Sequence, residues 1–196
     1  MKNNSKMNVP VYRSSKIMRL FLAIPLASEA TTQIFSLAAH LRSREDSFLW
    51  TRPASWHVTL QFLGETAPAQ ASCLNAALDA VRAAPVPIQF QSLACFERSG
   101  VFVLQIYPAP ALLALQQLVV AATRSCGFLP ENRPYRPHIT LARTRSAANL
   151  ATLRTRLLNP SSLPRFTAFG FNLYESFLSP AGARYEIRRR FPLSAF

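Results

Sequence analysis

The sequence predicts an α+β fold built from two pseudo-symmetric lobes of antiparallel sheet that face each other. Strand and helix patterns are interleaved along the 196 residues, and two pairs of strand patterns indicate antiparallel hairpins. The tetrapeptides at residues 57–60 and 138–141 are nearly identical and form a weak internal repeat. Since no low-complexity linker divides the chain, we expect one domain over residues 18–196, preceded by a loose polar extension over residues 1–17.

The N-terminal elements alternate between strand and helix. Residues 20–24 are a short apolar run that suits a buried strand. In residues 28–42 apolar side chains recur at helical spacing, and Ser28 is a candidate N-cap. Residues 57–63 favour a strand that stops at Gly64.

The middle of the chain is expected to hold two helices and a hairpin. Residues 68–84 are rich in Ala and Leu and predict a helix. Residues 88–93 and 101–107 predict two strands joined by a glycine-containing turn. Residues 110–125 predict another helix, whose end is marked by Gly127.

The order of elements then recurs. Residues 137–142 predict a strand and residues 147–157 a short helix. Two long antiparallel strands are expected over residues 166–178 and 185–193, joined by a turn that contains Pro and Gly.

The charge balance favours a polyanionic partner. Lys and Arg number 22 against nine Asp and Glu, which gives a formal net charge of +13. Such a surface attracts RNA, DNA or anionic lipid, and charge alone does not separate them. No apolar run approaches the roughly 20 residues needed to cross a bilayer, so we expect no membrane contact. No coiled-coil pattern or interface stripe stands out, which favours a monomer.

The cysteines favour a reducing compartment. Cys73, Cys95 and Cys126 are odd in number and lack C-x-x-C spacing. We therefore expect no disulfide framework and no zinc site, with each thiol acting as a small buried apolar group in a cytoplasmic protein.

The repeated tetrapeptides supply the candidate catalytic residues. Side chains alternate along a strand, so His57 and Thr59 share one face, as do His138 and Thr140, while the intervening apolar residues point to the core. A single His in an apolar strand is usually structural. Two matching copies, using two of the chain's three histidines, favour a functional pair.

A pair of histidines suits acid–base chemistry at phosphorus. Near neutral pH one imidazole can act as base and one imidazolium as acid, which the hydrolysis of a cyclic phosphodiester requires. Hydroxyls of Thr59 and Thr140 can hold the nonbridging oxygens. Arg143 could add a fork of donors, although a solvated surface arginine explains it equally well. The acidic residues are few and dispersed and no P-loop is present, so we expect neither metal nor cofactor.

At these motifs the chain resembles the 2H phosphoesterase superfamily and, within it, the RNA 2′,3′-cyclic phosphodiesterase family, also called 2′-5′ RNA ligases. The resemblance is carried by residues 18–26, 57–65, 133–143 and 173–185. It implies a bilobal fold with flanking helices around a central cleft, and the opening of a terminal 2′,3′-cyclic phosphate of RNA, including tRNA-derived RNA, to a 2′-phosphate. It also implies that His57 donates a proton to the leaving oxygen and that His138 accepts one from water. The residues themselves indicate the pair but not this order.

Two alternatives remain open from the sequence. The same site could run in reverse as a 2′-5′ RNA ligase that joins tRNA halves. The chain could also be a non-catalytic RNA-binding module, with aromatic–basic pairs such as Phe96 with Arg98 and Tyr135 with Arg136 stacking bases and gripping the backbone. Packing is the more common fate of such aromatic residues.

Overall fold

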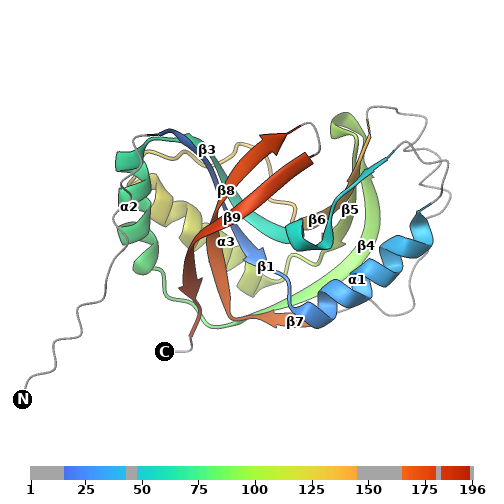
Figure 1. Cartoon of the computed structure of the whole chain (residues 1–196). Coiled ribbons are helices and arrows are strands. Elements are labelled where there is room, and N and C mark those ends of the chain that lie inside the picture. Colours follow the sequence, from blue (N-terminus) through green and yellow to red (C-terminus); the bar gives the residue numbers. More distant parts are fainter. Residues whose placement is uncertain (1–15, 43–47, 145–164, 180–181, 195–196) are drawn as a thin grey trace, which may run out of the picture.

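The computed structural model describes residues 16–42, 48–144, 165–179 and 182–194, and Figure 1 shows their arrangement. The strands are β1 (Met18–Pro25), β2 (Leu49–Trp50), β3 (His57–Thr66), β4 (Val86–Phe96), β5 (Val101–Ile106), β6 (His138–Arg143), β7 (Arg165–Ala168), β8 (Gly170–Ser179) and β9 (Gly182–Pro192). The helices are α1 (Ser28–Leu41), α2 (Pro68–Asp79) and α3 (Pro110–Arg124), with single 3-10 turns η1 (Pro53–Ser55) and η2 (Glu97–Ser99).

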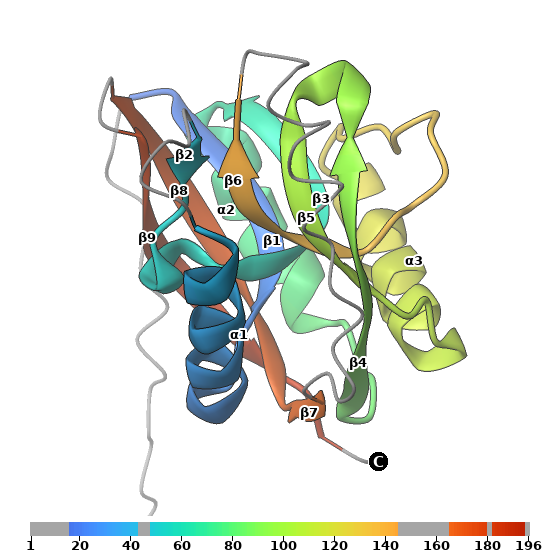
Figure 2. The ribbon, with the colours of Figure 1, turned by 90° about the vertical axis from the view of Figure 1, so that its right-hand side faces the viewer.

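Within these ranges the strands form two antiparallel sheets. One has four strands in the order β3-β1-β8-β9, and the other has five in the order β2-β6-β5-β4-β7. Figure 2 shows β6 and β5 side by side in the foreground, with β1, β8 and β9 behind them. Each sheet carries one copy of the repeated tetrapeptide, in β3 and in β6. The predicted α+β class with two lobes of antiparallel sheet is therefore confirmed.

The helices cover the sheets with regular apolar faces. In α1 the buried residues are Ala30, Ile34, Ala38 and Leu41, spaced three or four apart as a one-sided helix requires. Figure 1 shows α2 and α3 together at one end of the molecule and α1 at the other. None of the helices in the described ranges has the length and apolar character needed to span a membrane.

Two helix boundaries differ from the sequence prediction. The N-cap of α1 is Ala27, which makes no side-chain cap, so the assignment of that role to Ser28 is wrong. Helix α2 ends at Asp79 rather than at residue 84. Pro85 disfavours helical geometry in the residue before it, which limits how far the helix can extend.

Two strand predictions also need correction. Strand β3 continues through Gly64, whose φ of 71° accommodates an irregularity in the pairing with β1, and it ends at Thr66. The single strand expected over residues 166–178 is two strands, because the chain leaves one sheet at Ala168 and enters the other at Gly170. The expected helix at residues 147–157 and nearly all of the expected N-terminal extension lie outside the described residues.

A disulfide joins Cys73 of α2 to Cys126, which follows α3. The expectation that all three cysteines are reduced is therefore wrong for this pair, while Cys95 is half-buried in β4. The two cysteines are 53 residues apart in sequence and only the packing of α2 against α3 brings their Cα atoms to 5.7 Å. No local spacing pattern could have revealed such a pair.

This disulfide should make the stability of the chain depend on reductant. Closing a loop of this length restricts the unfolded chain and stabilises the fold by up to about 4 kcal/mol. We expect dithiothreitol to lower the urea unfolding midpoint of the wild type, and Cys73→Ala to remove this dependence. Cys95→Ala is the matched control and should leave it in place. An unfolding midpoint that is insensitive to reductant in the wild type would contradict the bond.

Candidate active site

Both motif histidines are held by the same hydrogen bond. His57 Nδ1 lies 2.7 Å from the carbonyl oxygen of Ser55, and His138 Nδ1 lies 2.7 Å from that of Arg136. A carbonyl oxygen only accepts, so Nδ1 of each ring is the protonated nitrogen. Nε2 of each ring is then left to accept a proton when the ring is neutral, or to donate one when it is charged.

Each motif strand also contains a register shift at its leucine. The residue that is skipped in the pairing is Leu60 in β3 and Leu141 in β6. Both strands consequently bury two consecutive residues at this point, where regular alternation would bury one. The two motifs therefore share a one-residue β-bulge as well as a sequence.

The bulge determines which face of the strand is occupied by the residues that follow it. In a regular strand, residues five apart point to opposite faces, and one extra residue returns them to the same face. Arg143 thus lies on the face of β6 that carries His138, and Phe62, at the equivalent position in β3, lies on the face that carries His57. Phe62 is 60% exposed and Arg143 is also exposed.

Aromatic rings enclose the two imidazoles unequally. His57 has ring centroids of Phe21 at 4.8 Å, Tyr185 at 5.2 Å and Tyr174 at 6.0 Å. His138 contacts the edge of Phe96 at 5.0 Å. Phe96, considered above as part of a base-stacking pair, packs instead against a motif histidine.

These surroundings lower the pKa of both histidines. Burial is the largest cause at His57 and lowers its pKa to about 4, with the charges of His138 and Arg143 acting in the same direction and the Ser55 carbonyl opposing them. Burial also lowers the pKa of His138, again with a contribution from Arg143. The Arg143 guanidinium acts on both imidazoles, so it lies near both of them.

The hydroxyls of Thr59 and Thr140 lie on the strand faces that carry the histidines, and they are available to a ligand. Thr59 is paired across the sheet with Ala23, and Thr140 with Val103, both of which are buried. Within the described residues neither threonine hydroxyl forms a hydrogen bond to another protein group. Each can therefore bind an oxygen of a ligand without first breaking a bond within the protein.

Tyr135 links the segment that precedes the second motif to the backbone of the first motif. Its hydroxyl donates to the backbone carbonyl of Thr59 at 3.0 Å. Burial raises the pKa of Tyr135, which keeps the phenol protonated and able to donate. In the second motif, the backbone carbonyl of Thr140 in β6 accepts a hydrogen bond from the hydroxyl of Thr51, which follows β2, at 2.7 Å. The backbone of each motif is therefore fixed by a side chain from elsewhere in the chain.

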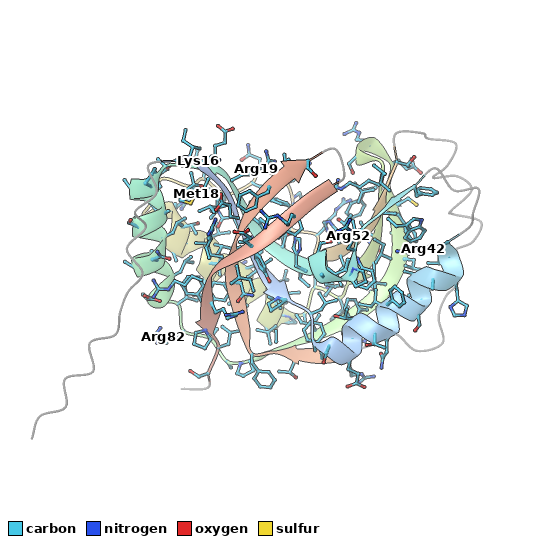
Figure 3. The ribbon with its side chains drawn as sticks, viewed as in Figure 1. Lys16, Met18, Arg19, Arg42, Arg52 and Arg82 are labelled. Atoms are coloured by element: carbon cyan, nitrogen blue, oxygen red, sulfur yellow. A yellow bond between two sulfur atoms is a disulfide. The ribbon has the colours of Figure 1, made fainter. Side chains whose placement is uncertain are left out.

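The arginines near the site differ from those on the outer face of β9. Arg184, Arg188 and Arg189 of β9 are ion-paired with carboxylates: Glu186, Glu175 and Asp79. Arg19 and Arg143 form no ion pair with any carboxylate of the described residues. Figure 3 places Arg19 at the end of the four-stranded sheet where the β8–β9 hairpin turns. Arg19 and Arg143, which both act on the phenol of Tyr185 beside His57, are thus among the arginines whose charge no carboxylate of the described residues offsets.

A family model described as the 2′-5′ RNA ligase superfamily matches residues 31–176, which is most of the chain and includes both motifs. The chain belongs to this superfamily. The family inferred from the motif resemblance is thus confirmed.

Relatives with curated names and a solved structure agree with this placement. The chain is 29% identical over 184 residues to an RNA 2′,3′-cyclic phosphodiesterase of Escherichia coli, covering 92% of this chain and 99% of that protein. It is 35% identical over 128 residues to one of Geobacillus stearothermophilus, covering 63% of this chain but 41% of that longer protein. The crystal structure of E. coli LigT complexed with ATP matches with a TM-score of 0.76 at 26% identity, over 92% of this chain and 100% of that one.

The structure brings the five predicted site residues to facing surfaces of the two sheets: His57, Thr59, His138, Thr140 and Arg143. Their chemical roles stay predictions. Sequence reasoning missed Phe62 and Tyr185. Phe62 stands five residues after His57, just as Arg143 stands five residues after His138, and this matching spacing could have found it. Tyr185 is one of the residues that carry the family resemblance in the closing hairpin, but its place beside His57 depends on the pairing of strands, which the local sequence does not show.

The low pKa of His57 can be tested by NMR titration of the free protein. We expect its midpoint at about 4 instead of the ordinary 6.5, because burial disfavours the charged ring. Adding inorganic phosphate should raise the midpoint, since a nearby anion favours the imidazolium. In Arg143→Gln the midpoint should also rise, because one of the opposing charges is removed. A midpoint near 6.5 in the free wild type would contradict the geometry described here.

Proposed function

We propose that this chain opens the 2′,3′-cyclic phosphate at an RNA end to a 2′-phosphate, using His57 and His138 as acid and base and no metal ion. One observation carries the proposal: two imidazoles in the same tautomer share an arginine neighbour and each has Nε2 free of the bond that fixes its ring. The named relatives support the substrate, since several are RNA 2′,3′-cyclic phosphodiesterases.

The reaction needs one proton removed and one supplied. Nε2 of neutral His138 takes a proton from water as the water oxygen bonds to phosphorus. The bond from phosphorus to the 3′ oxygen breaks, and Nε2–H of the His57 imidazolium protonates that oxygen. The phosphate remains on the 2′ oxygen, and a later proton exchange with solvent restores both rings. The division of roles between the two histidines follows the family resemblance.

The low pKa of His57 means that this histidine can act as the acid only if it gains a proton when the substrate binds. With a pKa of about 4, the ring is neutral in the free protein at pH 7 and cannot act as an acid. A bound phosphodiester anion favours the charged ring, so substrate binding raises the pKa and allows His57 to acquire its proton. Binding of substrate and protonation of His57 are therefore coupled in this proposal.

The remaining side chains provide charge stabilisation and orientation. The hydroxyls of Thr59 and Thr140 donate to the nonbridging oxygens, on which negative charge grows as water attacks. Arg143 adds guanidinium donors from the face of β6 that carries His138. The exposed ring of Phe62, which occupies the equivalent position in the other motif, is suited to stacking on the terminal base.

Acid–base chemistry also fits the ligand types near the motifs. No three His, Cys, Asp or Glu side chains of the described residues come together as a metal site. A catalytic divalent ion is usually held by several such groups. The proposal extends to tRNA-derived ends as substrates, a monomeric protein, and a single domain over residues 18–196.

Histidine variants test the acid and base directly. His57→Ala and His138→Ala should each lower kcat on a nucleoside 2′,3′-cyclic phosphate by roughly 10²- to 10⁴-fold, because one proton transfer is lost. His40→Ala, at the exposed end of α1, is the matched control and should retain activity. Wild-type turnover should be unaffected by EDTA, and the product should be the 2′-phosphate. Activity lost with EDTA and restored by zinc would overturn the mechanism.

The pH dependence of kcat/KM should be shifted to the acidic side. One ring must be charged and the other neutral, and both pKa values lie below the ordinary 6.5. Above them both rings are neutral and the acid is missing, so kcat/KM should peak below pH 6.5 and fall through pH 7. In Arg143→Gln the whole profile should move to higher pH, whatever the loss in absolute rate. A maximum at pH 8 or above would exclude this assignment.

The family description makes ligation the second candidate. The same groups could join a 2′,3′-cyclic end to a 5′-hydroxyl that takes the place of water. His138 would remove the proton of the 5′-hydroxyl as its oxygen bonds to phosphorus, and His57 would protonate the departing 3′ oxygen, which leaves a 2′-5′ phosphodiester. The rates of hydrolysis and of joining should be compared on one nicked tRNA substrate. Faster joining than hydrolysis would make the chain a ligase in practice, and neither reaction would leave an RNA-binding module.

A further inference from the structure

Three tyrosines lie near the first motif, and their hydroxyls are not equally occupied. The Tyr135 hydroxyl donates to the Thr59 carbonyl, and the Tyr174 hydroxyl accepts from Asn172 Nδ2 at 2.9 Å. The Tyr185 hydroxyl has no hydrogen-bond partner among the described residues. It belongs to a half-buried side chain but is not a buried unsatisfied atom, so it remains accessible and can donate to a ligand without first breaking a bond within the protein.

The ring of Tyr185 lies against the histidine of the first motif. Its centroid is 5.2 Å from that of His57 at an interplanar angle of 87°, and 5.0 Å from that of Phe21 at 75°. Two edge contacts of this kind fix the plane of the ring. The phenol oxygen is therefore held in position, although nothing in the described protein binds it.

Two arginines lie near Tyr185. Burial is the largest influence on the pKa of its phenol and raises it, which keeps the hydroxyl protonated, while the charges of Arg143 and Arg19 act in the opposite direction. Arg143 is also a neighbour of His57 and His138. Tyr185 therefore packs on His57 and shares an arginine neighbour with both motif histidines.

We propose that the Tyr185 hydroxyl donates a hydrogen bond to a nonbridging oxygen of the bound phosphate, as a sixth polar group beside Thr59, Thr140, Arg143, His57 and His138. The assignment rests on the function proposed above. Tyr185 comes from β9, the far edge strand of the four-stranded sheet, so it binds the phosphate from a direction that neither motif strand supplies.

The ring and the hydroxyl have separable effects. The ring packs on His57 and helps to keep that imidazole buried, which is a positioning role. The hydroxyl contacts the phosphate and gains strength as charge builds on the oxygen during attack. A substitution that keeps the ring and removes the oxygen therefore tests the proposal without disturbing the packing.

Tyr185→Phe is this substitution, and three measurements distinguish its outcomes. The kcat/KM for a nucleoside 2′,3′-cyclic phosphate should fall roughly 10- to 100-fold, the usual effect of losing one donor to a charged group. Affinity for inorganic phosphate, measured by calorimetry on the full chain, should weaken roughly tenfold. The NMR titration midpoint of His57 should not change, because the ring stays in place.

Two further variants complete the test. Tyr107→Phe removes a hydroxyl from an exposed tyrosine that follows β5, and it should change none of the three measurements. Tyr185→Leu removes ring and hydroxyl, and it should shift the His57 midpoint as well. Unchanged kcat/KM and phosphate affinity in Tyr185→Phe would overturn the proposal, as would a loss accompanied by a shifted His57 midpoint.

Failure of the proposed function would look different from failure of this assignment. If the wild type does not hydrolyse the cyclic phosphate, the enzymatic proposal fails. Phosphate affinity still decides the role of Tyr185: weakening in Tyr185→Phe supports an anion ligand in a binding protein, and unchanged affinity removes the role entirely.

Discussion

The bond from each imidazole Nδ1 to a carbonyl two residues earlier is the constraint on which the site depends. It fixes the tautomer of the ring and leaves Nε2 available. Ahead of His57 the accepting carbonyl belongs to Ser55, the last residue of the 3-10 turn η1, and ahead of His138 it belongs to Arg136, which is not part of a helical turn. Hydrogen bonds from Tyr135 and Thr51 then hold both motif strands in place. The chemistry is thus prepared by backbone geometry before any substrate arrives.

Each lobe contains the same arrangement of histidine, threonine and β-bulge, so the two halves of the site are nearly symmetric. Single residues make the two halves different. The bulges at Leu60 and Leu141 place the side chain that follows on the site face in both lobes, but one lobe presents Phe62 and the other Arg143. Aromatic enclosure differs as well, since His57 has three ring neighbours and His138 has one described here. The two faces of the site therefore differ chemically, one aromatic beside His57 and the other carrying the Arg143 charge beside His138.

Sequence alone predicted the parts that depend on local periodicity. Alternation along a strand sufficed to place His57 with Thr59 and His138 with Thr140, and to assign the fold class. Alternation did not reveal why Arg143 lies on the same face as His138 and Thr140, because that placement depends on a β-bulge. A bulge is defined by the pairing of two strands, and its trace in the sequence of one strand is at most a pair of adjacent apolar residues. The division of residues 166–178 between two sheets and the bond between Cys73 and Cys126 were missed for the same reason. Both depend on which surfaces meet in space.

The passage between sheets at Phe169 has a mechanical consequence. A single residue separates β7 in one sheet from β8 in the other, and a side-chain carbon at Gly170 would lie 2.9 Å from the carbonyl oxygen of Phe191. So short and tightly packed a crossing leaves no slack between the two sheets at this point. A side chain at position 170 would have to displace the backbone of β9 at Phe191, so the spacing of the two lobes here depends on the absence of a single carbon atom.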